Sequence, residues 1–358
     1  VELDSFLNED FNGKARRESV EGLYRLSGLQ QGMLFHGLYN ETGGAYTEQL
    51  SCDLTDPELE IIRKSWSRVL KNHTILRSGF YYDVFSVPVQ CVYREVEMPL
   101  TVLDYSNLEV EKRSEAIKDF ESADRFKSFD FKAAPLMRIA LIRKDENHFR
   151  MVWTSHHILF DGWSLPILLE EFLKTYDSLL KGTEIERFEA DKFEDYIRYI
   201  ERLDKEQQEI YWQNYLKGVE ENTLLPFVES TSERTKGAGA FDTFSLVLDE
   251  EFTSSIGKYA QKNRLTVNTL IQGTWSYLLH NYTGKKDIVY GVIVSGRPDD
   301  LSGIEHKVGM YINTLPLRSV LNKEEKITQW LQNIQSHQVS SRHHQYTPLN
   351  EIQGWTEV

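Results

Sequence analysis

The residues best suited to chemistry are two adjacent histidines followed by an acid and a glycine: His156, His157, Asp161 and Gly162. A histidine titrates near neutral pH, so it can take a proton from an attacking amine, hydroxyl or thiol and return it later. A nearby aspartate would fix the geometry of the imidazole through an ion pair or a hydrogen bond. Glycine permits close approach of the backbone to a reacting group. A histidine pair alone is usually structural, but this spacing after a strand is far more specific and indicates proton transfer.

The elements around this stretch place the histidines where a strand ends. Residues 136–143 and 148–155 are short runs rich in β-branched and aromatic residues, separated by turn residues, and they predict two adjacent strands. Asp161 and Gly162 break the second strand, and residues 165–180 continue with helical periodicity. Gly182 is the expected C-cap of that helix. The imidazoles therefore follow a rigid strand and precede an open loop.

Composition indicates a soluble enzyme large enough for two lobes. The chain has 358 residues, of which 40% are apolar and 27% are charged. Its net charge of −14 argues against nonspecific nucleic-acid binding and against an anionic membrane surface. Cys52 and Cys91 are the only cysteines and form no CxxC pair, which favours a reducing cytoplasm. We find no signal peptide and no run long enough to span a membrane, so we expect a cytoplasmic protein.

The order of patterns along the chain predicts a linker and two α/β lobes. Residues 1–22 are charged and weakly apolar and are interpreted as a linker from a preceding domain. Residues 23–182 form the N-terminal lobe with the histidines, and residues 183–358 form the C-terminal lobe. In the second lobe, a helix is expected over residues 267–282, capped by Thr266. Residues 287–294 predict a continuous apolar strand of the parallel, doubly covered kind.

The histidine stretch resembles the HHxxxDG motif of the condensation domains of nonribosomal peptide synthetases. Four further segments resemble other motifs of this family in their usual order, so the resemblance covers nearly the whole chain. They are residues 26–36 (LSPxQxGMLFH), 72–80 (RHxxLRTxF), 193–199 (YxDYxxW) and 295–318 (SGRPxxLxGIExxVGxxINTLPxR). Asn72, Ser78 and Tyr199 depart from these patterns.

The resemblance implies a fold of two chloramphenicol-acetyltransferase-like lobes arranged as a pseudo-dimeric V. Each lobe would be a mixed β-sheet with flanking helices, and a tunnel between the lobes would place His157 at its midpoint. Family members continue beyond the point where this sequence stops. We therefore expect the C-terminal lobe to be incomplete, with an unpaired sheet edge.

The resemblance also implies roles for individual residues. His157 would be the catalytic imidazole that orients or deprotonates an attacking amine, or stabilises developing charge. His156 and Asp161 would hold the loop, and the Gly162 N–H would help at the oxygen of the tetrahedral intermediate. Arg77 would pair with Asp161 and support the site.

Four more residues are candidates for the site. Ser164 would support it structurally, and three residues belong to the tunnel or second-lobe motif: Ser295, Arg297 and Asn313. The domain would need no cofactor or metal of its own, because both substrates would ride on the phosphopantetheine arms of carrier proteins. Its partners would be upstream and downstream peptidyl carrier proteins and adjacent adenylation or epimerisation domains of a larger synthetase for antibiotic biosynthesis.

Several rival functions share parts of this pattern. Heterocyclisation relatives carry DxxxxD instead, which His156 and His157 argue against. Epimerisation relatives share HHxxxDG and would abstract the α-proton of a carrier-bound aminoacyl thioester. Free-standing acyltransferases that act on coenzyme A thioesters usually match only the histidine motif. A non-catalytic module that recruits a partner enzyme is the alternative of a different class. Within the condensation family, residues 26–36 and 295–305 resemble the subtype that joins a D-configured donor to an L-configured acceptor.

Overall fold

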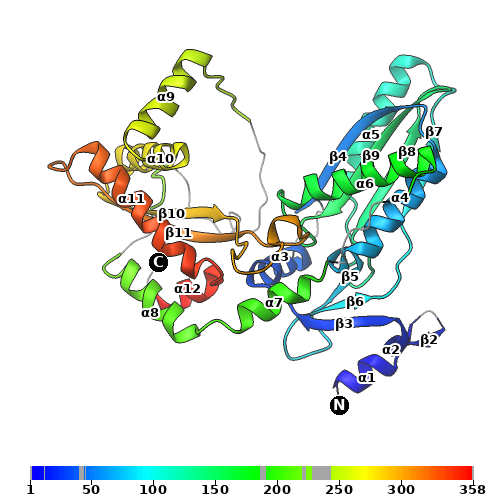
Figure 1. Ribbon diagram of the computed structural model, residues 1–358, viewed down its shortest axis with the longest axis horizontal. Coiled ribbons are helices and arrows are strands. Elements are labelled where there is room, and N and C mark those ends of the chain that lie inside the picture. The colour runs from blue at the N-terminus through cyan, green and yellow to red at the C-terminus, as the bar shows by residue number, and fades with distance from the viewer. Residues whose placement is uncertain are drawn as a thin grey trace. The chain divides into compact units, whose positions relative to one another are not determined.

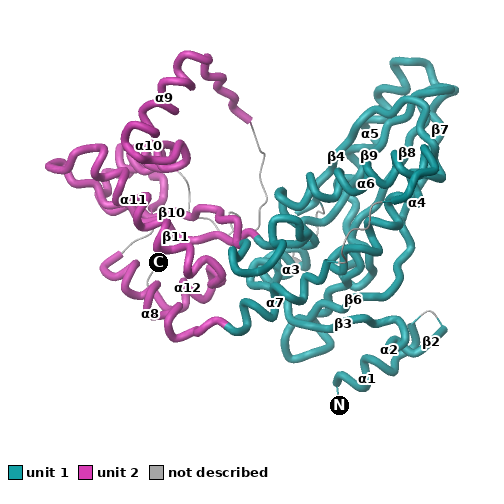
Figure 2. Tube along the Cα trace, in the orientation of Figure 1, with its two compact units in different colours: residues 1–202, 297–311 teal, residues 203–296, 312–358 magenta. Residues whose placement is uncertain are grey.

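The computed structural model of the chain describes residues 2–11, 13–39, 44, 46–185, 191–219, 223–227 and 243–356. These residues fold as mixed helices and strands, so the predicted α/β class is confirmed (Figure 1). The chain divides into two compact units (Figure 2). Unit 1 contains residues 1–202 and 297–311, and unit 2 contains residues 203–296 and 312–358.

Unit 1 contains two principal sheets, a short hairpin and the helices around them. Its elements are α1 (Glu2–Asn8), β1 (Asp10–Phe11), β2 (Lys14–Ala15), α2 (Arg16–Ser19), β3 (Val20–Arg25), α3 (Gly28–Tyr39), β4 (Thr47–Thr55), α4 (Leu59–Asn72), η1 (Thr74–Arg77), β5 (Ser78–Tyr81), β6 (Val89–Tyr93), β7 (Leu100–Asp104), α5 (Val110–Phe126), β8 (Met137–Arg143), β9 (His148–His156), α6 (Ser164–Lys181), α7 (Phe193–Glu201) and η3 (Ile304–His306). The larger sheet has the order β4-β9-β8-β7, and the smaller has the order β3-β6-β5.

Strand β9, which carries the histidines, lies inside the larger sheet. It is antiparallel to β4 and to β8, while β7 is parallel to β8. Successive side chains of a strand point to opposite faces, and both faces of β9 are covered. Trp153 packs against Trp66 of α4, and that ring stacks on Phe172 of α6. Val152 packs on the other side with Ile117 of α5. This two-sided packing makes β9 a rigid support for the residues at its end.

The N-terminal residues, which the sequence predicts to be a linker, are folded and packed against the rest of unit 1. The side chain of Phe6 in α1 is only 1% exposed, and its ring lies 4.8 Å from that of Tyr81 in β5. Arg16 lies over the Phe6 ring, 4.0 Å from its centroid, and pairs with Glu9 at 2.7 Å. The charged composition of this segment gives no sign that two aromatic residues, Phe6 and Phe11, pack it onto the smaller sheet.

The boundary between the two units also differs from the predicted break after residue 182. Helix α7 stays with unit 1 because it buries Phe193, Tyr196 and Ile197. Just before it, Asp191 forms a parallel bridge with His73. Residues 186–190, which closely follow the predicted break, lie outside the described residues. Chain continuity suggested a simple division, but residues 297–311 belong to unit 1.

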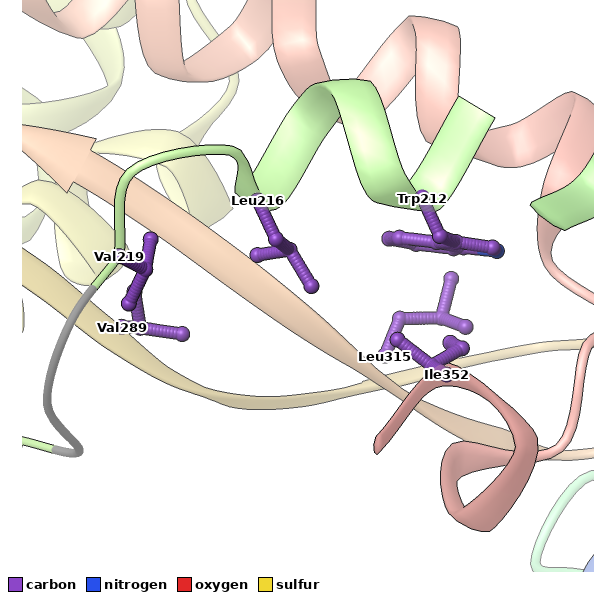
Figure 3. Close-up of a cluster of buried hydrophobic side chains, with 6 residues drawn as sticks. All are labelled: Trp212, Leu216, Val219, Val289, Leu315 and Ile352. Carbon is purple, nitrogen blue, oxygen red and sulfur yellow. The ribbon is translucent and has the colours of Figure 1, made fainter. Parts of the chain in front are cut away.

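Unit 2 is built around one pair of strands with five helices among its described residues. Its elements are α8 (Lys205–Leu216), α9 (Glu250–Lys262), α10 (Val267–Thr283), β10 (Asp287–Val294), β11 (Asn313–Val320), α11 (Ile327–Ser341), η4 (Arg342–His344) and α12 (Leu349–Trp355). Figure 3 shows a cluster in which α8, the strands and α12 each bury apolar side chains. It consists of Trp212, Leu216, Val219, Val289, Leu315 and Ile352.

In unit 2, the sequence correctly predicted the ends of helix α10 but not the pairing of strand β10. The Thr266 hydroxyl caps α10 by accepting from the Thr269 N–H, and Gly284 ends the helix with φ of 71°. Strand β10 has the predicted bounds but pairs antiparallel with β11, so the parallel, doubly covered interpretation is wrong. In the described ranges, no helix is both long enough and apolar enough to cross a bilayer.

Candidate active site

His157 lies one residue beyond β9, in a turn that fixes its ring. Its backbone N–H donates to the Tyr46 carbonyl at 2.7 Å. Its Nδ1 lies 2.8 Å from the Phe160 carbonyl oxygen, which can only accept. Nδ1 therefore carries the proton, and Nε2 of the neutral ring keeps its lone pair. Nε2 lies 3.6 Å from the Glu48 carboxylate, and the side chain is 20% exposed. The result is an oriented, accessible proton acceptor.

His156, the last residue of β9, is buried behind His157. Its Nδ1 accepts the Ile158 N–H at 3.1 Å, and its ring lies edge-on to Phe131 with the centroids 4.9 Å apart. Burial, and then the neighbouring His157, lower the pKa of His156 to about 4. The ring is therefore neutral at physiological pH. Its contacts hold the turn together, and its acceptor nitrogen is already used within that turn.

Asp161 is fully buried and accepts four hydrogen bonds. Oδ1 accepts from the backbone N–H and the hydroxyl of Ser164 at 3.1 and 3.0 Å, and from Arg297 at 3.3 Å. Oδ2 accepts from the Tyr311 N–H at 3.1 Å. The Asp161 N–H in turn donates to the Gly309 carbonyl at 3.1 Å. This carboxylate joins the histidine loop to residues 297–311.

Arg297 supplies the counter-charge of Asp161. One guanidinium nitrogen reaches both Asp161 and the Ser164 hydroxyl, at 3.3 and 3.1 Å. The other donates to the carbonyls of Ile304 and Lys307 at 2.6 and 2.8 Å. The group also lies over the Tyr311 ring, 4.3 Å from its centroid. A planar fork with several donors fits this combination of carbonyls and carboxylate.

The predicted pairing of Arg77 with Asp161 is wrong. Arg77 ends η1, from which its side chain reaches the end of β6 instead. It pairs with Glu21 at 2.9 Å, donates to the Leu70 carbonyl at 3.0 Å and donates to the carbonyls of Tyr93 and Arg94. Arg77 therefore ties helix α4 to the smaller sheet. Arg297, which the sequence had assigned to the tunnel or second-lobe motif, is the arginine at Asp161.

The remaining candidates separate between the two units. Ser164 is buried at the start of α6, and its hydroxyl oxygen also accepts the Gly309 N–H at 3.1 Å. Gly162 is exposed in the loop, and a Cβ there would meet nothing within 4 Å. Ser295 and Asn313 belong to unit 2. Asn313 is buried there and donates to the carbonyls of Gln345 and Thr347, at 2.9 and 2.7 Å, which secures the start of β11.

A second buried ion cluster, which sequence reasoning did not identify, holds the same segment. Nε2 of His73 lies 2.7 Å from Glu171 of α6, and Nδ1 lies 3.6 Å from Asp191. Asp191 accepts the Val308 N–H at 2.6 Å and lies 3.5 Å from Lys307. The histidine and both acids are almost fully buried but far apart in sequence, so no local pattern signals their contact.

This cluster predicts that the stability of the chain falls with rising pH. Burial disfavours the charged ring of His73, but the carboxylates of Asp191 and Glu171 outweigh that effect and raise its pKa to about 9. Unfolded histidine titrates near 6.5, so the folded state holds the proton more tightly. The stabilisation is complete below about pH 6.5 and is lost as the pH rises toward about 9.

Over that window, we expect the His73 contribution to the free energy of unfolding to decline by about 3 kcal/mol. Urea unfolding at a series of pH values measures this free energy, with His73→Gln as the reference that cannot titrate. The difference between wild type and variant should shrink as pH rises. A difference that stays constant across the window contradicts the prediction.

Comparisons with known proteins place the chain among relatives of one kind. A family model described as the condensation domain matches residues 20–358. One component of the linear gramicidin synthase of Brevibacillus parabrevis is 36% identical over 356 residues. That alignment covers 99% of this chain but only 4% of the relative, so the chain spans a small part of that synthase.

Solved structures give the same fold. The first condensation domain of the calcium-dependent antibiotic synthetase, in complex with a substrate analogue, superposes with a TM-score of 0.70 at 19% identity. The match covers 92% of this chain and 77% of that one. The X-domain from teicoplanin biosynthesis, solved in complex with OxyB, gives a TM-score of 0.78 at 21% identity, covering 94% and 73% of the two chains. These likenesses establish the architecture.

Proposed function

The chain belongs to the condensation-domain family of nonribosomal peptide synthetases, and from this membership we propose that it joins two carrier-bound substrates through a peptide bond. Peptide-bond formation by acyl transfer is the reaction of this family. In the proposed step, the amine of an aminoacyl group on a downstream carrier attacks the thioester of a peptidyl or aminoacyl group on an upstream carrier. The extended peptide then stays on the downstream carrier, and the upstream carrier is left with a free thiol.

The observation that carries this proposal is the fixed tautomer of His157. Because Nδ1 donates to the Phe160 carbonyl at 2.8 Å, Nε2 is the nitrogen that can accept a proton from the attacking amine. When the attacking amine loses a proton to Nε2, its nitrogen does not keep the positive charge that attack would otherwise leave on it, and the product is a stable amide. Holding both substrates beside Nε2 also removes much of the entropic cost of a bimolecular step.

The other residues of the motif are assigned supporting roles. His156 and Asp161 are buried and hydrogen-bonded, which suits them to holding the loop that carries His157. Gly162 is exposed in that loop, where its N–H would interact with the oxygen of the tetrahedral intermediate. Ser164 and Arg297 would act through Asp161.

The proposal requires carrier proteins as partners and no cofactor of the domain itself. Both substrates would be thioesters on phosphopantetheine arms, so the activated bond would arrive with the donor. Adjacent adenylation or epimerisation domains of a larger synthetase would supply the loaded carriers. Within this scheme we assign the chain to the subtype that takes a D-configured donor, on the motif resemblance of residues 26–36 and 295–305.

A two-carrier transfer assay tests the proposal. One carrier protein is loaded with a donor aminoacyl group of D or L configuration, and a second is loaded with an acceptor amino acid. After mixing with the chain, intact mass of both carriers reports transfer, and donor deuterated at the α-carbon reports proton exchange.

We expect the acceptor carrier to gain the mass of the donor, and to do so faster from the D-configured donor. Loss of the α-deuterium without transfer would instead establish epimerisation. If neither transfer nor proton exchange occurs, and the folded chain still binds a carrier or another enzyme, the result would favour a recruiting module.

A further inference from the structure

A carboxylate that the sequence did not single out lies beside the candidate catalytic imidazole. Glu48 is in β4, which pairs with β9, and its Cα is opposite that of Ser155. Its Oε1 lies 3.6 Å from Nε2 of His157, the nitrogen that keeps the lone pair. Among the described residues, this imidazole is the one group able to become a cation within 4.0 Å of the Glu48 carboxylate.

The geometry separates this pair from a structural hydrogen bond. At 3.6 Å the two atoms are too far apart for a hydrogen bond, so the Nε2 lone pair of the neutral ring is not already committed to this carboxylate. Glu48 is 46% exposed, compared with 20% for His157. A pair this exposed adds little to stability. Both side chains are therefore partly open to solvent, from which a substrate amine would approach.

The position of Glu48 is also well defined by its neighbours. The next residue, Gln49, points to the opposite face of the strand and donates to Glu121, Thr154 and Asp124. On the other side, the Tyr46 carbonyl accepts the His157 N–H at 2.7 Å. These contacts fix β4 on both sides of Glu48, so the approach of its carboxylate to the imidazole follows from the strand register.

We propose that Glu48 is a second catalytic residue, which receives the ammonium group of the acceptor and stabilises the imidazolium that forms at His157. This inference rests on the proposed function, because it concerns the amine that attacks the donor thioester. A carrier-bound amino acid carries a positively charged amine at neutral pH, and that amine must lose a proton before it can attack. An exposed carboxylate next to an imidazole attracts such a cation and gives the proton a path to solvent.

The proton balance of the reaction gives each group one task. The ammonium first loses one proton to the Glu48 carboxylate, which passes it to solvent. The free amine then attacks the thioester carbon, so that a C–N bond forms and the C–S bond breaks. The second amine proton moves to Nε2 of His157 and from there to the leaving sulfur. The products are the amide, the thiol and one released proton, and Glu48 is again a carboxylate beside the imidazole.

The test is a double-mutant cycle on the two-carrier transfer rate. Glu48→Gln keeps the shape of the side chain and removes its charge, and we expect a roughly tenfold lower rate, a smaller loss than the 10²- to 10⁴-fold expected from removing an acid–base group. In the His157→Ala background, the same substitution should lower the residual rate by less than in the wild type, because the imidazolium that Glu48 stabilises no longer forms and only its contact with the ammonium remains. Glu48→Asp keeps the charge and should recover most of the loss.

A matched control makes the same chemical change at an exposed ion pair on another element. Glu60→Gln removes an exposed carboxylate that pairs with Arg63 at 3.8 Å in α4, and it should leave the rate unchanged. Thermal unfolding of each variant verifies that the chain is folded. An unchanged rate for Glu48→Gln, or an equal loss with and without His157, would overturn the inference while transfer by the wild type still supports the proposed function. Absence of transfer by the wild type would instead count against the proposed function.

Discussion

His157→Ala is expected to lower the rate of donor-to-acceptor transfer by about 10²- to 10⁴-fold, the effect typical of removing a group that moves a proton in the transition state. The reason is the lone pair at Nε2, which accepts the proton of the amine. The hydrogen bond from Nδ1 to the Phe160 carbonyl orients the ring so that this lone pair points away from the turn. Alanine removes both nitrogens, while the rest of the loop keeps its contacts through His156 and Asp161. Residual transfer would come from holding the two substrates close together.

The matched control for this substitution lies on the same strand. His148→Ala removes an exposed histidine at the other end of β9, where it pairs with Asp145 at 2.8 Å. We expect it to leave the single-turnover rate within about twofold of wild type, because a surface pair of this kind contributes little. Intact-mass kinetics of both variants, with equal circular dichroism spectra, make the comparison. Equal transfer rates for the wild type and His157→Ala would show that the imidazole takes no part in the reaction.

Local sequence patterns predicted the scaffold of the site because its elements are defined by short-range chemistry. Strand β9 is recognised by its β-branched and aromatic run, and α6 by its apolar period and the left-handed Gly182 that ends it. Phe6 shows the opposite case: one aromatic residue in a charged segment anchors α1, and composition averages it away. The predicted parallel pairing of β10 was wrong because an apolar run does not specify whether the neighbouring strand, here β11, is parallel or antiparallel.

The candidate site was predictable in type but not in its contacts. The histidines and Asp161 form one short stretch, so their chemistry can be recognised from spacing alone. Which arginine pairs with Asp161 depends on tertiary structure, because both Arg77 and Arg297 lie in recognisable motifs. Only the path of residues 297–311 into unit 1 decides it. The contact of Glu48 with His157 depends in the same way on the register of β4 against β9, which no single-strand pattern fixes.

Asp161→Asn is expected to destabilise unit 1 by about 3–5 kcal/mol, the cost of breaking one side of a buried ion pair. Every partner of the carboxylate is a donor: Ser164 and Arg297 at Oδ1, and the Tyr311 N–H at Oδ2. An asparagine has one acceptor oxygen and one NH₂ group, so either orientation sets a donor against a donor. The charge of Arg297, whose side chain is 11% exposed, is left unpaired as well. Urea unfolding followed by circular dichroism measures the loss.

A double-mutant cycle shows that the loss belongs to this pair and not to burial in general. Combining Asp161→Asn with Arg297→Lys should give a coupling energy of about 1–3 kcal/mol, because the two side chains share hydrogen bonds. Combining it with Arg77→Lys should give additive effects within about 0.5 kcal/mol, because Arg77 pairs with Glu21 instead. Coupling to Arg77 but not to Arg297 would restore the pairing expected from the motifs. The predicted result makes Asp161 the residue that holds residues 297–311 against the loop of His157, so transfer should weaken in Asp161→Asn even where the chain remains folded.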